Sequence, residues 1–138
     1  MGAFKLIRYE LDPNGREWLP LETFVGSVEQ LERVLATLIA SRPTFVDLVA
    51  PNGDLLHLGV GGPVASVAFA TPEMLREGRA IGPEGTVDAD EAGEWVEFEA
   101  GGTPTPINRD VLVHAAELVT IARHFFETGE PHPDFTWE

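Results

Sequence analysis

The sequence lacks cysteine, has few basic residues and contains no long apolar run. Without cysteine, the chain can form no disulfide framework, thiol nucleophile or cysteine-ligated metal centre. Its 9 lysine and arginine residues are outnumbered by 23 aspartate and glutamate residues, which gives a formal charge of −14. Proteins that bind nucleic acid or anionic membranes need clustered positive charge, so this composition argues against both kinds of partner.

The absence of long apolar runs bears on location. No run approaches the ~18 residues that a membrane span needs. The first residues carry Lys5, Arg8 and Glu10, which is unlike a secretory signal peptide. We therefore expect a cytoplasmic protein with no membrane partner. The 138 residues, 43% of them hydrophobic, suit one domain over residues 1–138 that needs no metal or disulfide to fold.

The strand signals that are present form a series of short runs. Runs of branched and aromatic residues, or alternating ones, predict strands. They occupy residues 3–9, 44–50, 55–60, 64–70 and 94–100, with short extended pieces at 23–25 and 135–137. Turn residues at 51–54 and 61–63 join the three middle runs, which indicates an antiparallel meander with 94–100 as its fourth strand. Turn residues at 101–104 follow that strand. A short helical turn is expected to begin at residues 71–73. Residues 78–93 show little apolar pattern and are expected to form a loop.

Two segments have the apolar period of a helix. Ser27 and Gln30 match a capping box before a helix over residues 28–41. Asn108 is expected to cap a second helix over residues 109–127, with Gly129 after its end. The sequence therefore predicts an α+β fold, with an antiparallel sheet of about five to six strands packed against two main helices in a single layer.

Searches for catalytic and ligand-binding patterns yield one weak candidate. His57 and Asp47 lie on neighbouring predicted strands, and a His–Asp pair beside the glycine turn 59–62 could act as a general base or line a pocket. No helix follows that turn, so a phosphate loop is not expected. His114 and Glu117 could share a metal, but His124 lies ~15 Å further along a helix. We predict no catalytic residue, cofactor or metal site.

The strongest local feature is an acid-rich segment that contains a tryptophan. Seven carboxylates fall within residues 84–99, and no basic residue lies between Arg79 and Arg109. Along the strand, Trp95 shares one face with Glu97 and Glu99, while Val96 and Phe98 are expected to face the helices. An aromatic side chain ringed by carboxylates fits an interface for a basic protein. The alternative is a solvated acidic loop that keeps the protein soluble. The predicted contact residues are Glu84, Asp88, Asp90, Glu91, Glu94, Trp95, Glu97 and Glu99.

Three stretches give the chain a family resemblance. They are the glycine-turn hairpin 53–62 with the strand after it, Pro106-Ile107 before the long helix, and the ending 125–131 that closes on Trp137. From about Ser27 onward, this order resembles the first-numbered family of bacterial polymorphic-toxin immunity proteins, whose members end with a helix, a Thr-Gly-x-x-Pro turn and a short strand closing on Trp. The spacing from Pro131 to Trp137 departs from that pattern.

The resemblance implies a non-enzymatic protein that binds a cognate toxin and blocks its active site. The family often accompanies nucleic-acid deaminase toxins, whose clefts must accept an anionic substrate. We expect the acidic segment to occupy such a basic cleft. Two other classes stay open: a small enzyme or ligand-binding domain with a pocket near His57, and a self-associating module. A homo-oligomer is possible but not indicated by the sequence.

Overall fold

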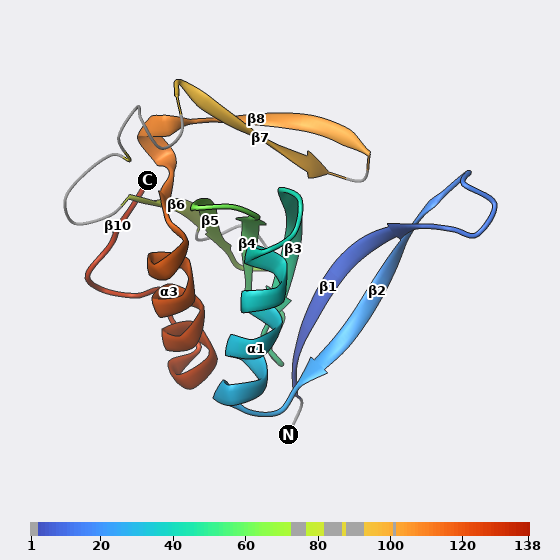
Figure 1. The fold of residues 1–138 in the computed structure, drawn as a ribbon. Helices are drawn as coiled ribbons and strands as arrows, with labels where there is room; N and C mark the ends of the chain where they lie inside the picture. Colours follow the sequence, from blue (N-terminus) through green and yellow to red (C-terminus); the bar gives the residue numbers. More distant parts are fainter. Residues whose placement is uncertain (1–2, 73–76, 82–86, 88–92, 101) are drawn as a thin grey trace.

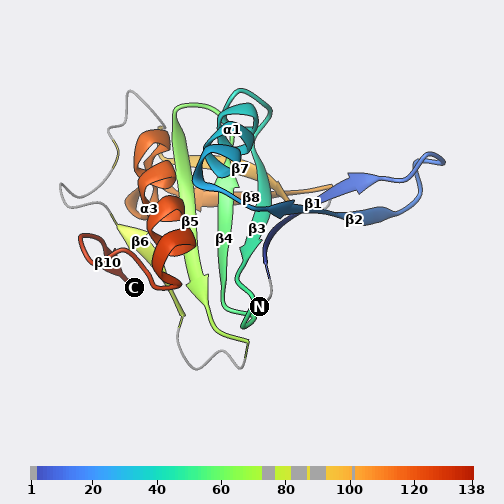
Figure 2. The ribbon, with the colours of Figure 1, turned by 90° about the horizontal axis from the view of Figure 1, so that it is seen from below.

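The computed structural model has the predicted α+β architecture, with an open sheet and the two long helices on one of its faces (Figures 1 and 2). It describes residues 3–72, 77–81, 87, 93–100 and 102–138. Main-sheet neighbours follow the order β10-β6-β5-β4-β3-β1-β2, and each of these pairs is antiparallel. The strands are β1 (Phe4–Leu11), β2 (Trp18–Val25), β3 (Thr44–Val49), β4 (Leu55–Val60), β5 (Val64–Ala70), β6 (Glu77–Ile81) and β10 (Thr136–Trp137).

The meander β3-β4-β5 confirms the prediction and forms the centre of the sheet. The β3–β4 turn has Gly53 at φ +94°, and the side chain of Asn52 accepts a hydrogen bond from the backbone N–H of Asp54 at 3.0 Å. Strand β5 pairs with β4 and β6, and also with the short strand β9 (Val113–His114). Its small and apolar side chains are almost all buried, as expected of a central strand.

Helices α1 (Val28–Ile39) and α3 (Ala115–Thr128) cover one face of this meander. Helix α1 begins as predicted, because the Ser27 hydroxyl accepts a hydrogen bond from the Gln30 N–H at 3.1 Å. The main core lies between these helices and the sheet. Its fully buried side chains include Leu31, Leu35, Leu48, Leu56, Leu58, Leu118, Ile121 and Phe125.

The predicted start of the second helix was wrong. Residues 109–111 form a 3₁₀ turn, η1, and residues 113–114 pair with β5, so α3 begins only at Ala115. The side chain of Asn108 makes no capping bond. Instead Glu117 accepts hydrogen bonds from the His114 backbone and ring nitrogens at 2.9 and 2.8 Å. Strand pairing and this His114–Glu117 cap outweigh the helical period of the preceding residues.

The opposite face of the meander is covered by a second hairpin rather than by helices (Figure 2). Strand β7 (Trp95–Ala100) pairs with β8 (Thr103–Asn108) and touches the meander through one parallel pairing, Thr44 with Glu99. Thus β7 is not a fourth meander strand, and the predicted 101–104 turn leads into β8. The prolines at 104 and 106 suit β8, which pairs only with β7 in the described chain.

The first hairpin is longer than predicted and projects from the body (Figures 1 and 2). All eight residues of β2 pair with β1, whereas only a short extended piece at 23–25 was expected. Strand β3 pairs with β1 only at residues 5–7, so residues 8–22 form a ribbon beyond the sheet. We call this ribbon the arm. Its hydrophobic residues occupy both faces, which hides the alternation that normally marks a strand.

The expected loop over 78–93 is also partly wrong, because residues 77–81 form β6 between β5 and β10. Backbone hydrogen bonds to a buried neighbouring strand hold this segment despite its weak apolar pattern. The expected helical turn beginning at residues 71–73 extends into 73–76 and lies outside the described residues.

Candidate functional site

The acidic strand β7 presents its tryptophan as the sequence predicted. The Trp95 side chain is 52% exposed, and Glu94 and Glu97 beside it are exposed as well. Glu99 is half-buried, and its backbone carbonyl accepts a hydrogen bond from the Thr44 hydroxyl at 3.1 Å. Predicted contact residues Glu84, Asp88, Asp90 and Glu91 lie outside the described residues. The structure therefore places three of the eight predicted residues on β7 and a fourth, Glu94, immediately before it.

The inward side chains of β7 contact the sheet, which corrects the expectation that they face the helices. Phe98 is fully buried, and its ring centroid lies 5.4 Å from that of Phe45. Gly59 on β4 leaves room for this contact, since a Cβ there would lie 3.1 Å from both rings. A second, smaller core thus holds the β7–β8 hairpin against the sheet. Its members are Phe45, Val64, Val87, Phe98, Ile107 and Leu112.

The His57–Asp47 pair forms on the same face of the sheet. The two residues are directly opposite in the β3–β4 register, and His57 Nδ1 lies 2.6 Å from Asp47 Oδ1. The His57 ring also stacks on Phe45, with centroids 4.5 Å apart and planes 15° from parallel. A carboxylate acceptor places a proton on Nδ1, so Nε2 of the neutral ring is an acceptor. Asp47 and Phe45 together fix the orientation of the imidazole.

A cavity of about 360 Å³ opens beside His57, between the base of the arm and the end of β7. Tyr9 and Trp18 line it from the arm, Phe45 and His57 from the sheet, and Ala100 from β7. The neighbouring turn is close enough that a Cβ on Gly102 would lie 2.6 Å from Trp18 Nε1. The arm therefore contacts the β7–β8 turn, and the cavity between them is lined mainly by aromatic rings. The 59–62 turn predicted to border this pocket contributes none of the lining residues.

Sequence reasoning missed the arm as a candidate interaction surface. Within the described chain, six of the seven large hydrophobic side chains that are exposed belong to it or to its base. These six are Tyr9, Leu11, Trp18, Leu19, Leu21 and Phe24. The sequence did contain a signal for it, namely the many large apolar residues between positions 9 and 24. A two-stranded ribbon cannot bury that many side chains on one face. Large exposed apolar side chains gathered in one segment make that segment a candidate interaction site.

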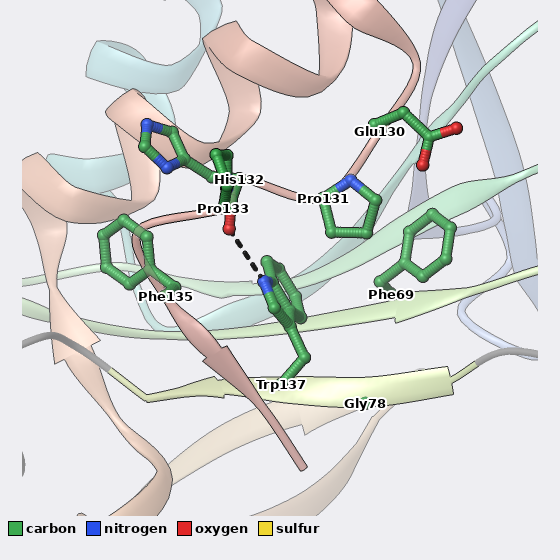
Figure 3. A pocket seen from close by; sticks show the side chains of 8 residues that line it. All are labelled: Phe69, Gly78, Glu130, Pro131, His132, Pro133, Phe135 and Trp137. Carbon is green, nitrogen blue, oxygen red and sulfur yellow. Dashed lines mark hydrogen bonds between the residues drawn. The ribbon is translucent and has the colours of Figure 1, made fainter.

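A second cavity, of about 340 Å³, lies where the chain ends (Figure 3). Gly129 ends α3 in the left-handed region at φ +76°, and the loop after it returns to pair β10 with β6. The indole N–H of Trp137 donates to the carbonyl oxygen of His132 at 3.0 Å (Figure 3). Gly78 allows this approach, because a Cβ there would lie 3.1 Å from Trp137. Trp137 therefore has a structural role, because it holds the loop after α3 against β6.

The described residues contain no group of three His, Asp or Glu side chains that could hold a metal ion. His114 and Glu117, which the sequence offered as metal ligands, bond to each other at the start of α3. In the described part of the chain, no helix is long and apolar enough to cross a membrane. Comparison with known proteins adds no relative: no family model matches the chain, and no curated protein matches it significantly.

Proposed function

We propose that this chain is a protein-binding inhibitor of the immunity type, which neutralises a toxin domain by covering its basic active-site cleft. The observation that carries the proposal is the outward face of β7, where exposed Trp95 shares the face with exposed Glu97, and exposed Glu94 comes just before the strand. Tryptophan is enriched among the residues that anchor protein interfaces, and neighbouring carboxylates favour a cationic partner. The family resemblance in the hairpin, the Pro-Ile pair and the Trp ending supports the toxin as that partner.

Two further observations favour binding to a protein. The rigid backing of Phe98 fixes β7 in advance, so little conformational entropy is lost on binding there. The arm adds exposed apolar area on the side of the molecule where β7 ends. The net charge of −14 would accelerate encounter with a basic cleft and would repel nucleic acid.

A second candidate function is binding of a small ligand in the cavity at His57. Its volume of about 360 Å³ falls at the low end for ligand sites. Its lining is mainly aromatic, and its side-chain polar groups are the His57 imidazole, the Tyr9 hydroxyl and the Trp18 indole N–H. A reaction would need several polar groups converging on one substrate atom. The geometry therefore supports recognition there better than catalysis.

The decisive experiment mixes this protein with the product of the neighbouring gene, which the proposed function predicts to carry a toxin domain. We expect a stoichiometric complex, loss of toxin activity and association that slows as salt rises from about 50 mM to about 300 mM. The double variant Glu97→Lys/Glu99→Lys should weaken binding at least about tenfold.

The matched control is Glu29→Lys/Glu138→Lys, which changes the net charge equally. Glu29 lies on α1 at the opposite face of the sheet, and Glu138 ends the chain. If both double variants lose affinity alike, general charge and not the β7 surface governs binding. If the protein neither binds nor inhibits the toxin, the proposed function is wrong.

A further inference from the structure

The cavity at the base of the arm has the composition of a cation-binding box. Four of its five lining residues, Tyr9, Trp18, Phe45 and His57, present rings. Aromatic faces carry negative electrostatic potential and attract ammonium and guanidinium groups that lie over them. Because these rings come from the arm and from the sheet, they approach the cavity from two sides.

The charges near the cavity favour a cation over an anion. Asp47 is bonded to the lining residue His57 and so places a carboxylate beside the cavity. Lys5, which lies on the same face of β1 as Tyr9, is paired with Glu22 at 3.3 Å. With His57 neutral, the His57–Asp47 pair carries one negative charge and leaves Nε2 as a hydrogen-bond acceptor. A planar guanidinium can stack on a ring and donate to that nitrogen at the same time.

The same features argue against a second copy of this chain as the occupant. Two copies would bring together two charges of −14. Extension of the sheet through β2 is also disfavoured. Asp12 N–H donates to Glu17 O at 2.8 Å, so Asp12 and Glu17 are a hydrogen-bonded pair of the antiparallel ladder. Hydrogen-bonded pairs alternate with non-bonded ones along the ladder, and Pro20, which is opposite Tyr9, is in a non-bonded pair. The nitrogen of Pro20 therefore points toward the free edge of β2. Proline offers no N–H there, which blunts an edge strand against pairing.

We propose that the cavity lined by Tyr9, Trp18, Phe45, His57 and Ala100 receives an arginine side chain of a basic partner protein. This inference rests on the proposed function for the identity of the partner but not for the chemistry of the site. The arginine stacks between the arm rings and the sheet rings, and the neighbouring apolar side chains of the arm cover the stem. The cavity volume of about 360 Å³ accommodates one long side chain with room for water.

The test uses N-acetyl-arginine methylamide and N-acetyl-citrulline methylamide with the full chain. Citrulline keeps the planar shape of arginine and lacks its charge. We expect the arginine probe to shift the NMR signal of the Trp18 indole N–H saturably, at millimolar concentration, and to bind at least about fivefold more tightly than the citrulline probe. The indole signals of Trp95 and Trp137 should move little.

Tyr9→Leu and Trp18→Leu should each abolish the preference for arginine, because leucine fills space without a ring face. The control is Trp95→Leu, which removes an exposed indole elsewhere and should leave probe binding unchanged. Tyr9 is 44% exposed, so its variant should fold even if Trp18→Leu does not. Circular dichroism of each variant checks this.

Equal binding of the two probes would overturn the proposal and identify a neutral apolar pocket instead. Equal shifts at all three indoles would overturn it as non-specific association. The two proposals fail separately. A toxin that binds Tyr9→Leu as tightly as the unmodified protein would refute only the arginine box. An arginine-selective cavity in a protein that ignores the neighbouring toxin would refute only the proposed function.

Discussion

Truncation of Phe98 tests how the candidate surface is held in place. This ring is fully buried between β7 and the sheet, with Phe45 at 5.4 Å and Gly59 beneath it. Phe→Ala changes at buried sites cost about 3–5 kcal/mol, through lost burial and the cavity left behind. A free energy of unfolding for one domain is about 5–15 kcal/mol, so Phe98→Ala should remove a large fraction of it.

The matched change is Trp95→Ala, three residues away on the outward face of the same strand. Because Trp95 is half-exposed, we expect it to cost only about 1 kcal/mol, roughly half the value of full burial. Urea unfolding followed by circular dichroism gives both values, provided that the slope m is unchanged. Both changes should weaken toxin binding, but for different reasons. Trp95→Ala should act directly, by removing a contact from a folded protein, whereas Phe98→Ala should act indirectly, by loosening the hairpin.

The reasoning would be refuted if Phe98→Ala costs less than about 1.5 kcal/mol, because the hairpin would then not depend on its buried anchor. It would also be refuted if Trp95→Ala is the more destabilising of the two. In that case Trp95 would be a structural residue, and its exposure would not indicate an interface.

Four further substitutions test the fold around the site. Gly61→Ala and Gly62→Ala form a matched pair, because both glycines are at positive φ. A Cβ at Gly61 would lie 2.6 Å from the Pro43 backbone, whereas a Cβ at Gly62 would have no atom within 4 Å. We expect Gly62→Ala to cost about 1–2 kcal/mol in unfolding free energy and Gly61→Ala clearly more, and equal costs would contradict the packing of this turn. Ser27→Ala removes the hydroxyl that accepts from Gln30 N–H and should cost about 1 kcal/mol by thermal or urea unfolding, while no loss would argue against that cap. Gly102→Ala would place a methyl 2.6 Å from Trp18 Nε1, so the Trp18 indole NMR signal should shift while that of Trp137 does not; an unchanged Trp18 signal would mean that the arm does not rest on this turn.

The sequence predicted those elements whose signals are local. The meander follows from alternating runs joined by turn residues, and α1 follows from an apolar stripe that begins at a capping serine. The His57–Asp47 pair was predictable because a hairpin turn at 51–54 sets which residues of its two strands are opposite. Exposure of Trp95 followed from the two-residue period of its strand.

The parts that sequence reasoning missed depend on distant contacts. Nothing local shows that Phe98 contacts Gly59 on the far side of the sheet, because the period of a strand does not say what covers each face. The start of α3 moved because residues 113–114 pair with β5, some fifty positions earlier in the chain. The arm escaped detection since both of its faces are apolar, and the aromatic cavity forms only where the arm meets β7.

The most direct test of the central claim is the affinity for the toxin domain that the proposal expects to be encoded beside this gene. It is measured at low and high salt with the unmodified protein and with Glu97→Lys/Glu99→Lys. We predict tight binding that weakens with salt and falls at least about tenfold in the double variant, while Glu29→Lys/Glu138→Lys binds nearly as well as the unmodified protein. Absence of binding, or an affinity that neither salt nor the β7 reversals change, would contradict the claim that an acidic surface on β7 neutralises a basic toxin.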